Sequence, residues 1–416
     1  MTLILIIFSV LFLLLLKNKS LAVLLIVVQL VSIIGTYFLG REMKVETGSD
    51  YGWLFLMLLL LLLIILPWKY YYKTKDIVDI DPKKLKIITY FLIGINSIVF
   101  VVFLIAAITV QTTVEDINEF KYAEGVSVDF YYNKLPFPPV FFNFAIIFYY
   151  FSYFILPLHF YYLYKKKVWL SVICFLLSFN IVLYGLTFFS RAVVVQYALL
   201  YISFLFLLYG TLAPRFKRIL KFSLIFLGLI ATAYFINISQ QRFEQDVKSS
   251  KTYSKGIPVE AITQDPVVYG YLDYTSQGFF NGYEVLQLYE GEGFGGTLTF
   301  ESILGFVSTP MQTYERNKYR AKLWPRHYSY SFNGFPAYTV YDYGIIGSII
   351  FCLLYFVVVK RMRPKENGIK LKNLFLIVLL IQIPLMSIFY SQVGGLLISF
   401  ILWIPLWIYL NLKIKR

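Results

Sequence analysis

The sequence has few of the residue types on which soluble enzymes and secreted modules depend. Cysteine and histidine each occur only twice in 416 residues, and Cys174 and Cys352 both lie inside apolar runs. Such a pair forms no disulfide framework and offers no Cys/His set for zinc. Charged residues make up 15% of the chain, whereas a soluble domain has about 25%. A soluble enzyme, a nucleic-acid binder and a disulfide-built module are therefore excluded.

Several catalytic motifs are also missing. The chain has no Walker motif, no HExxH and no GxSxG, which excludes an ATP-driven pump, a zinc hydrolase and a nucleophile-elbow hydrolase. Asp79-Ile-Asp81 has the DxD spacing of metal-dependent sugar transferases. It lies in a short loop with no domain around it, so we interpret it as chance. We expect no cofactor and no metal.

Long apolar runs dominate what is present. Hydrophobic residues make up 59% of the chain and the mean hydropathy is +0.69. Runs of this length predict an all-α polytopic membrane protein of about eleven transmembrane helices, with the fifth interrupted at Pro157. The predicted spans are residues 2–16, 20–39, 53–67, 87–109, 139–162, 168–186, 192–210, 219–237, 336–359, 371–389 and 394–411.

The charge alternates between successive connections. One set of connections, with adjoining helix starts, holds 24 of the 38 basic and 4 of the 23 acidic residues. The excess of Lys and Arg places this set in the cytoplasm, with the N-terminus outside and the C-terminus inside. The net charge of +15 is thereby explained without nucleic acid. The predicted partner is the lipid bilayer.

The spans divide the chain into three regions. Residues 1–237 form a bundle of about eight spans with an outer loop at 110–138, and residues 336–416 form about three more. Between them, residues 238–335 form a large outer loop rich in Tyr and Phe, which we expect to be ordered. Long loops on a rigid scaffold often carry function.

Within the large loop, helical spacing of aromatic residues predicts an amphipathic helix over 276–290, capped by Asp273 or Ser276. The glycine-rich segment 291–296 lacks the lysine of a phosphate loop and predicts a turn. The apolar stretch 297–308 is too short to span a bilayer and fits a re-entrant or buried segment.

Arginine is concentrated on the predicted outer side. Arg316 and Arg320 are four residues apart in the basic stretch 311–327, so on a helix they share a face. This stretch is either a phosphate site, for which the guanidinium fork is suited, or a solvated basic surface. Two further outer arginines, Arg191 and Arg242, lie at predicted helix ends.

Asp342 falls about two turns inside the ninth predicted span. An acid within a span is costly and is a functional-site hypothesis by default. The alternative is a helix-end acid that pairs with an arginine, and such a pair is itself compatible with a site.

Two short motifs now suggest a family. Ser190-Arg191-Ala192 forms a tight outer turn, and Tyr338, Asp342, Tyr343, Gly344 and Gly347 fit a Y-x-x-x-Asp-Phe-Gly-x-x-Gly pattern, with Tyr343 where Phe is usual. Together with the large outer loop they resemble the Wzy-type O-antigen or oligosaccharide repeat-unit polymerases. By motif the resemblance covers about residues 180–360, and by topology the whole chain.

The resemblance implies a GT-C-like bundle in the bacterial cytoplasmic membrane with an active site on its outer face. A metal-independent glycosyltransferase would move a growing glycan from polyprenyl diphosphate to an incoming polyprenyl-diphosphate-linked oligosaccharide. The product is an O-antigen or capsule polysaccharide. A chain-length regulator and a flippase of the same pathway are possible partners.

Roles for residues follow from that chemistry. A diphosphate leaving group needs charge stabilisation, and the acceptor hydroxyl needs a base. The predicted diphosphate-binding residues are Arg191, Arg242, Arg316, Arg320 and Arg326. The candidate bases, which the sequence does not rank, are Asp342, His327 and Glu284. Tyr283, Trp324 and Tyr338 either stack on sugars or pack at the membrane interface.

Three other functions stay open, and one of them is a purely structural subunit of a glycan assembly complex, which would tolerate the loss of Arg191 and Asp342. An O-antigen-ligase-like enzyme would use the same chemistry with a different acceptor. A transporter or flippase of lipid-linked sugars would require polar residues in mid-span and paired breaks in its helices, of which the sequence shows few.

Overall fold

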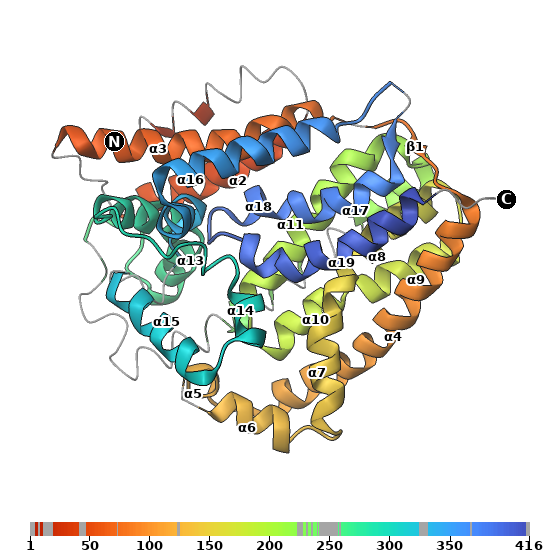
Figure 1. The fold of residues 1–416 in the computed structure, drawn as a ribbon, viewed down its shortest axis with the longest axis horizontal. Helices are drawn as coiled ribbons and strands as arrows, with labels where there is room; N and C mark the ends of the chain where they lie inside the picture. Colours follow the sequence, from red (N-terminus) through yellow and green to blue (C-terminus); the bar gives the residue numbers. More distant parts are fainter. Residues whose placement is uncertain are drawn as a thin grey trace. The chain divides into compact units, whose positions relative to one another are not determined.

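The structure is a computed structural model that describes most of the chain. The described residues are 5–6, 9–10, 20–40, 47–72, 74–122, 125–222, 228–229, 232–233, 236–238, 240, 257, 259–323, 332–366 and 368–412. They are predominantly helical, and they fall into two compact units that each combine distant parts of the sequence (Figure 1).

The first unit draws its described residues from 1–72, 256–363 and 380–398. Within it, α13 packs against α2, α3 and α16, and α16 also packs along α3. Its elements are α2 (Leu21–Phe38), α3 (Gly48–Ile65), η1 (Leu66–Tyr70), α13 (Pro266–Gln287), α14 (Glu301–Val307), α15 (Pro310–Leu323), α16 (Gly334–Arg361), α18 (Gln382–Met386) and the start of α19 (Val393–Asn411).

The second unit draws its described residues from 73–255, 364–379 and 399–416. Here α4 packs against α7, α8, α9 and α10, and α8 packs against α9. Its elements are β1 (Ile77–Val78), α4 (Pro82–Thr113), α5 (Ile117–Tyr122), α6 (Val126–Asn133), α7 (Pro139–Phe148), η2 (Tyr149–Phe151), α8 (Ser152–Tyr164), α9 (Val168–Ser178), α10 (Asn180–Thr187), α11 (Arg191–Leu208), η3 (Tyr209–Thr211), β2 (Ile369–Lys370), most of α17 (Leu371–Leu380) and the rest of α19.

Eight helices in the described part of the chain are long and apolar enough to cross a membrane. They correspond to eight of the eleven predicted spans and confirm an all-α, multi-pass membrane protein. The predicted spans 2–16 and 219–237 lie mostly outside the described residues. The span predicted at 371–389 is shorter, Leu371–Met386, and it is interrupted at Ile381 between α17 and α18.

Two sequence expectations about helix geometry are wrong. The fifth span changes to a 3-10 turn at Tyr149–Phe151, whereas Pro157 lies inside the regular helix α8. A proline is tolerated in a membrane helix when neighbouring groups satisfy the freed backbone. The loop helix α13 begins at Pro266, so Asp273 and Ser276 lie inside it and do not cap it.

Asp265 instead lies at the start of α13, where its carboxylate accepts the backbone N–H of Val268 at 2.9 Å. A short acceptor before the first turn satisfies an N–H group that has no partner within the helix. Asp81 does the same for α4, accepting the backbone N–H of Lys83 at 2.9 Å, and Asp79 pairs with Lys165 at 2.7 Å. Both acids of the DxD spacing therefore have structural roles.

Contacts between connections respect the predicted division into two sides. Strands β1 and β2 pair in parallel, with Ile77 opposite Ile369, and join two connections assigned to the cytoplasm. On the other side, Tyr131 in the loop 110–138 donates its hydroxyl hydrogen to the Thr187 carbonyl at 2.8 Å. Connections assigned to the same side thus meet within the second unit.

The core of the first unit includes α13, for which the sequence predicts an amphipathic helix of the outer loop. Tyr283 is fully buried, and a Cβ added to Gly278 would lie 1.8 Å from the Ile388 carbonyl oxygen. Such an approach of two backbones requires glycine. Part of the large loop is therefore packed into the bundle.

Candidate functional site

The site is built around a break in α16. Gly344 has φ 71° and ψ 175° and interrupts the helix, a backbone conformation open essentially to glycine alone. Asp342 lies just before this break and is 2% exposed. The predicted position of Asp342 near the start of a long apolar helix is confirmed, and the break was not foreseen.

At the break, carbonyl groups before Gly344 lose the N–H partners that a regular helix would give them. Backbone N–H groups of the glycine-rich turn 291–296 take the place of those partners. Phe294 donates its backbone N–H to the Tyr341 carbonyl at 2.6 Å, and Gly296 donates to the Asp342 carbonyl at 2.7 Å. A Cβ on Gly293 would lie 2.8 Å from the Tyr341 oxygen. The glycines thus let this turn approach α16 closely enough for its N–H groups to bind the free carbonyl groups.

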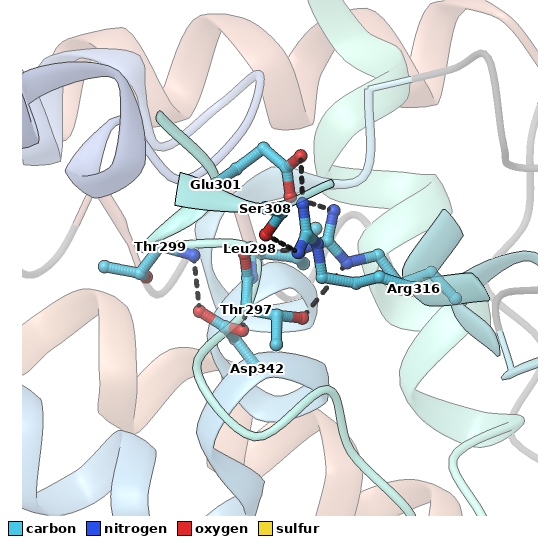
Figure 2. A network of polar contacts seen from close by, with 8 residues as sticks. Thr297, Leu298, Thr299, Glu301, Ser308, Arg316 and Asp342 are labelled. Atoms are coloured by element: carbon cyan, nitrogen blue, oxygen red, sulfur yellow. Dashed lines mark hydrogen bonds and ion pairs between the residues drawn. The ribbon is translucent and has the colours of Figure 1, made fainter. Parts of the chain in front are cut away.

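The Asp342 side chain also binds the segment that follows this turn. One carboxylate oxygen accepts the backbone N–H of Leu298 and the other that of Thr299, each at 2.9 Å (Figure 2). Hydrogen bonds from N–H groups to an ionised carboxylate are stronger than neutral ones. Asp342 therefore holds the segment that leads into α14.

Two arginines of α15 converge on Glu301, the first residue of α14 (Figure 2). Arg320 Nη1 lies 2.5 Å from Glu301 Oε2, and Arg316 Nη2 lies 3.5 Å from Oε1. Both arginine side chains are 13% exposed. The prediction that Arg316 and Arg320 share one helix face is confirmed.

Further hydrogen bonds position the two guanidinium groups. Arg316 Nη1 donates to the Ser308 hydroxyl at 2.9 Å. Arg320 Nε donates to the Thr297 hydroxyl at 3.1 Å, and Arg320 Nη2 donates to the Thr297 carbonyl. The cluster of Glu301, Arg316 and Arg320, called the Glu301 clamp below, is therefore attached to the segment that Asp342 holds.

A cavity of about 280 Å³ opens beside these residues. Both Asp342 and Glu301 line it. The other lining residues are Leu298, Thr299, Ser302, Tyr338, Thr339, Tyr390, Ser391, Gly394 and Gly395. Hydroxyl and carboxylate groups of this kind suit a hydroxyl-rich ligand.

The structure brings some predicted site residues together. Asp342 and Tyr338 line the cavity, and Arg316 and Arg320 contact one of its walls through Glu301. Glu284 is half-buried on α13, and Arg191 is a buried first residue of α11 in the second unit. Four predicted residues lie outside the described part of the chain: Arg242, Trp324, Arg326 and His327.

Tyr283 is the predicted sugar-stacking residue whose ring the structure encloses. It is 0% exposed, and its hydroxyl accepts a hydrogen bond from Gln287 Nε2 at 3.2 Å. Burial, with the nearby Asp50 charge, raises the pKa of Tyr283 to about 12. Its ring is a core side chain of α13.

Sequence reasoning missed Glu301, Thr299 and Tyr390. Glu301 lies inside the apolar stretch 297–308 and belongs to no motif, and only its pairing with arginines 15 and 19 residues later indicates a role. Thr299 contributes through its backbone N–H, which no side-chain pattern reveals. The segment 297–308 is not buried throughout, since Val307 is 72% exposed, and its re-entrant character stays a prediction.

Comparison of the chain with protein-family models, curated proteins and solved structures gives no match.

Proposed function

We propose that this membrane protein is a glycosyltransferase that polymerises polyprenyl-diphosphate-linked oligosaccharide repeat units on the outer face of a bacterial cytoplasmic membrane. The observation that carries the proposal is the cavity shared by Asp342 and Glu301, with Arg316 and Arg320 attached to Glu301. Carboxylates and arginines side by side supply the two functions that the transfer needs.

The reaction requires a base and an anion-binding group. A carboxylate in hydrogen-bond reach of the acceptor hydroxyl accelerates its attack by about 10²–10⁴-fold. Arginines beside the leaving diphosphate stabilise the charge that develops on it. Tyr338 and Tyr390 in the cavity wall offer aromatic faces and hydroxyl groups to a sugar ring.

Some residues enter the proposal on sequence evidence. Arg191, within Ser190-Arg191-Ala192, is a further diphosphate-binding residue, as are Arg242 and Arg326. His327 and Glu284 stay as alternative bases, and Trp324 as a sugar-binding residue. Transfer to an acceptor other than a lipid-linked repeat unit would instead make the protein ligase-like.

One observation favours a transporter or flippase as a second candidate. Transporters place binding sites at discontinuous helices whose free backbone groups hold the substrate or ion, and α16 is interrupted at Gly344. Here the carbonyls of Tyr341 and Asp342 accept hydrogen bonds from Phe294 and Gly296. They are engaged in the fold, so the enzyme is the better proposal.

The test is an assay with purified protein in lipid vesicles. It receives a polyprenyl-diphosphate-linked repeat unit from its own host, without nucleotide sugar, ATP or added metal, and products are read as a glycan ladder. We expect a ladder that Arg191→Ala and Arg320→Ala each reduce by about 10²–10³-fold. The matched control is Lys318→Ala, which removes an exposed cation of the same helix α15 and should leave the ladder unchanged.

The other outcomes separate the alternatives. A ladder that neither arginine variant changes would keep the function and reject these residues. Transfer to a different acceptor lipid or protein, without elongation, would indicate a ligase. Movement of intact lipid-linked sugar across the bilayer without any ladder would identify a flippase.

A further inference from the structure

Asp342 and Glu301 line the same cavity but differ in how their carboxylates are held. Each oxygen of Asp342 accepts a backbone N–H at 2.9 Å. Both oxygens are therefore already engaged with buried backbone donors, and a buried donor that loses its acceptor is costly. Asp342 is thus committed to holding the segment before α14.

Among the described residues, by contrast, the Glu301 carboxylate is held by side chains and not by backbone N–H groups. Its side chain is 39% exposed and forms ion pairs with Arg316 and Arg320. Glu301 is the first residue of the seven-residue helix α14, and it lines the cavity. A ligand that neutralised the arginines would therefore free this carboxylate without breaking any helix.

The arginines have donors to spare for such a ligand. Within the described part of the chain, Arg316 Nε and Nη2 are buried and make no hydrogen bond, although Nη2 lies 3.5 Å from Glu301. A buried N–H donor without an acceptor is costly, and a tetrahedral anion supplies several acceptor oxygens in the geometry that guanidinium prefers. The Glu301 clamp is therefore a preformed but underused anion site.

We propose that Glu301 is a displaceable carboxylate, which occupies Arg316 and Arg320 in the free protein and becomes the catalytic base when a diphosphate takes those arginines. The inference rests on the proposed function. The diphosphate oxygens pair with the two guanidinium groups, and Glu301 turns to the acceptor hydroxyl in the cavity. Substrate binding would thus switch on the base only when a donor is present.

The transfer step balances. The acceptor hydroxyl gives its proton to the Glu301 carboxylate while its oxygen forms a bond to the anomeric carbon of the donor sugar. The bond between that carbon and the phosphate oxygen breaks, and its electron pair leaves with the polyprenyl diphosphate. Arg316 and Arg320 hold the charge that the leaving group acquires.

The proposal predicts opposite effects of one substitution on binding and on turnover. Glu301→Gln removes the competing charge but keeps the shape of the side chain. We expect the variant to bind inorganic diphosphate about tenfold more tightly than wild type and to elongate glycan about 10²–10⁴-fold more slowly. A merely structural glutamate would not produce tighter binding together with slower turnover.

The experiment uses the full chain in lipid nanodiscs. Diphosphate affinity is measured by isothermal titration calorimetry and elongation by the ladder assay, for wild type, Glu301→Gln, Arg316→Ala with Arg320→Ala, and the control Lys318→Ala. The double arginine variant should lose diphosphate binding. The control should match wild type in both measurements, and thermal unfolding of each variant verifies that it is folded.

Each outcome decides the proposal. Unchanged or weaker diphosphate binding by folded Glu301→Gln overturns the displacement, and undiminished elongation overturns the role as base. If the wild type makes no ladder, the proposed function fails and the base assignment fails with it. The binding measurement still decides by itself whether Glu301 competes with diphosphate for the arginines.

Discussion

Thr299 donates its backbone N–H to the carboxylate of Asp342 at 2.9 Å, which links a position two residues before α14 to a residue of α16 that lies 43 positions later in the chain. The acid that the sequence marks as costly is thus the anchor of the segment that carries Glu301. Of the two acidic residues that line the cavity, Asp342 positions the segment and Glu301 is the proposed base. The assignment has consequences for stability that can be measured without any substrate.

Asp342→Asn should destabilise the protein. An amide presents one oxygen and one NH₂ group, so one of the two backbone N–H groups of Leu298 and Thr299 would face a donor. Leaving a buried donor without its acceptor costs about 1–3 kcal/mol. The measurement is thermal unfolding in detergent, followed by intrinsic fluorescence.

The matched control for this change is Glu292→Gln. It removes an exposed carboxylate from the adjacent glycine-rich turn and should shift the unfolding temperature little. Equal unfolding temperatures for Asp342→Asn and Glu292→Gln would contradict the anchoring role of Asp342.

Gly344→Ala should also destabilise the first unit. The glycine has φ 71° and ψ 175°, a conformation that costs a side-chain-bearing residue of order 1–3 kcal/mol. Gly52→Ala in α3 is the control, since a Cβ there meets nothing within 4 Å and alanine gains roughly 0.5–1 kcal/mol in a helix interior. Shifts of the same sign in both variants would argue against a required break at Gly344.

The sequence predicts what depends on local composition. Apolar runs of membrane-spanning length locate eight helices that the structure describes, because length and hydropathy are properties of one segment. The spacing of Arg316 and Arg320 predicts their common face for the same reason. Asp342 stands out because an acid in an apolar helix is rare.

Features that depend on distant backbone contacts could not be predicted. Glu301 acquires its role only because the turn 291–296 docks against the break in α16, and nothing in its own segment indicates this. The amphipathic pattern of α13 is compatible with a surface helix. The close approach of Gly278 to Ile388 is what makes α13 part of the core.

Gly278→Ala tests that packing. A Cβ at this position would lie 1.8 Å from the Ile388 carbonyl oxygen, so α13 or the chain before α19 must move. Overpacking of this kind typically costs about 1–3 kcal/mol. We expect a lower unfolding temperature than for Gly52→Ala, and protease cleavage of the variant at lower temperature. A variant as stable as that control would mean that α13 does not pack closely against this segment.

The sidedness of the loop can be read by cysteine labelling. Cys174 and Cys352 are free and 0% exposed, so the native protein should not react with a membrane-impermeant maleimide until it is denatured. Single cysteines are then introduced at exposed positions in the wild-type background, Asn317→Cys on α15 and Glu366→Cys in the connection 360–370.

The positive-inside rule assigns these two positions to opposite sides. Asn317→Cys should be labelled in intact, right-side-out vesicles, and Glu366→Cys only after the membrane is permeabilised. The reverse pattern would place the Glu301 clamp in the cytoplasm, where nucleotide-activated sugars are available, and would reject an outer-face polymerase. A single crossing by α16, which lies between the two positions, places them on opposite sides of the bilayer. Labelling of both positions in intact vesicles would therefore contradict that crossing.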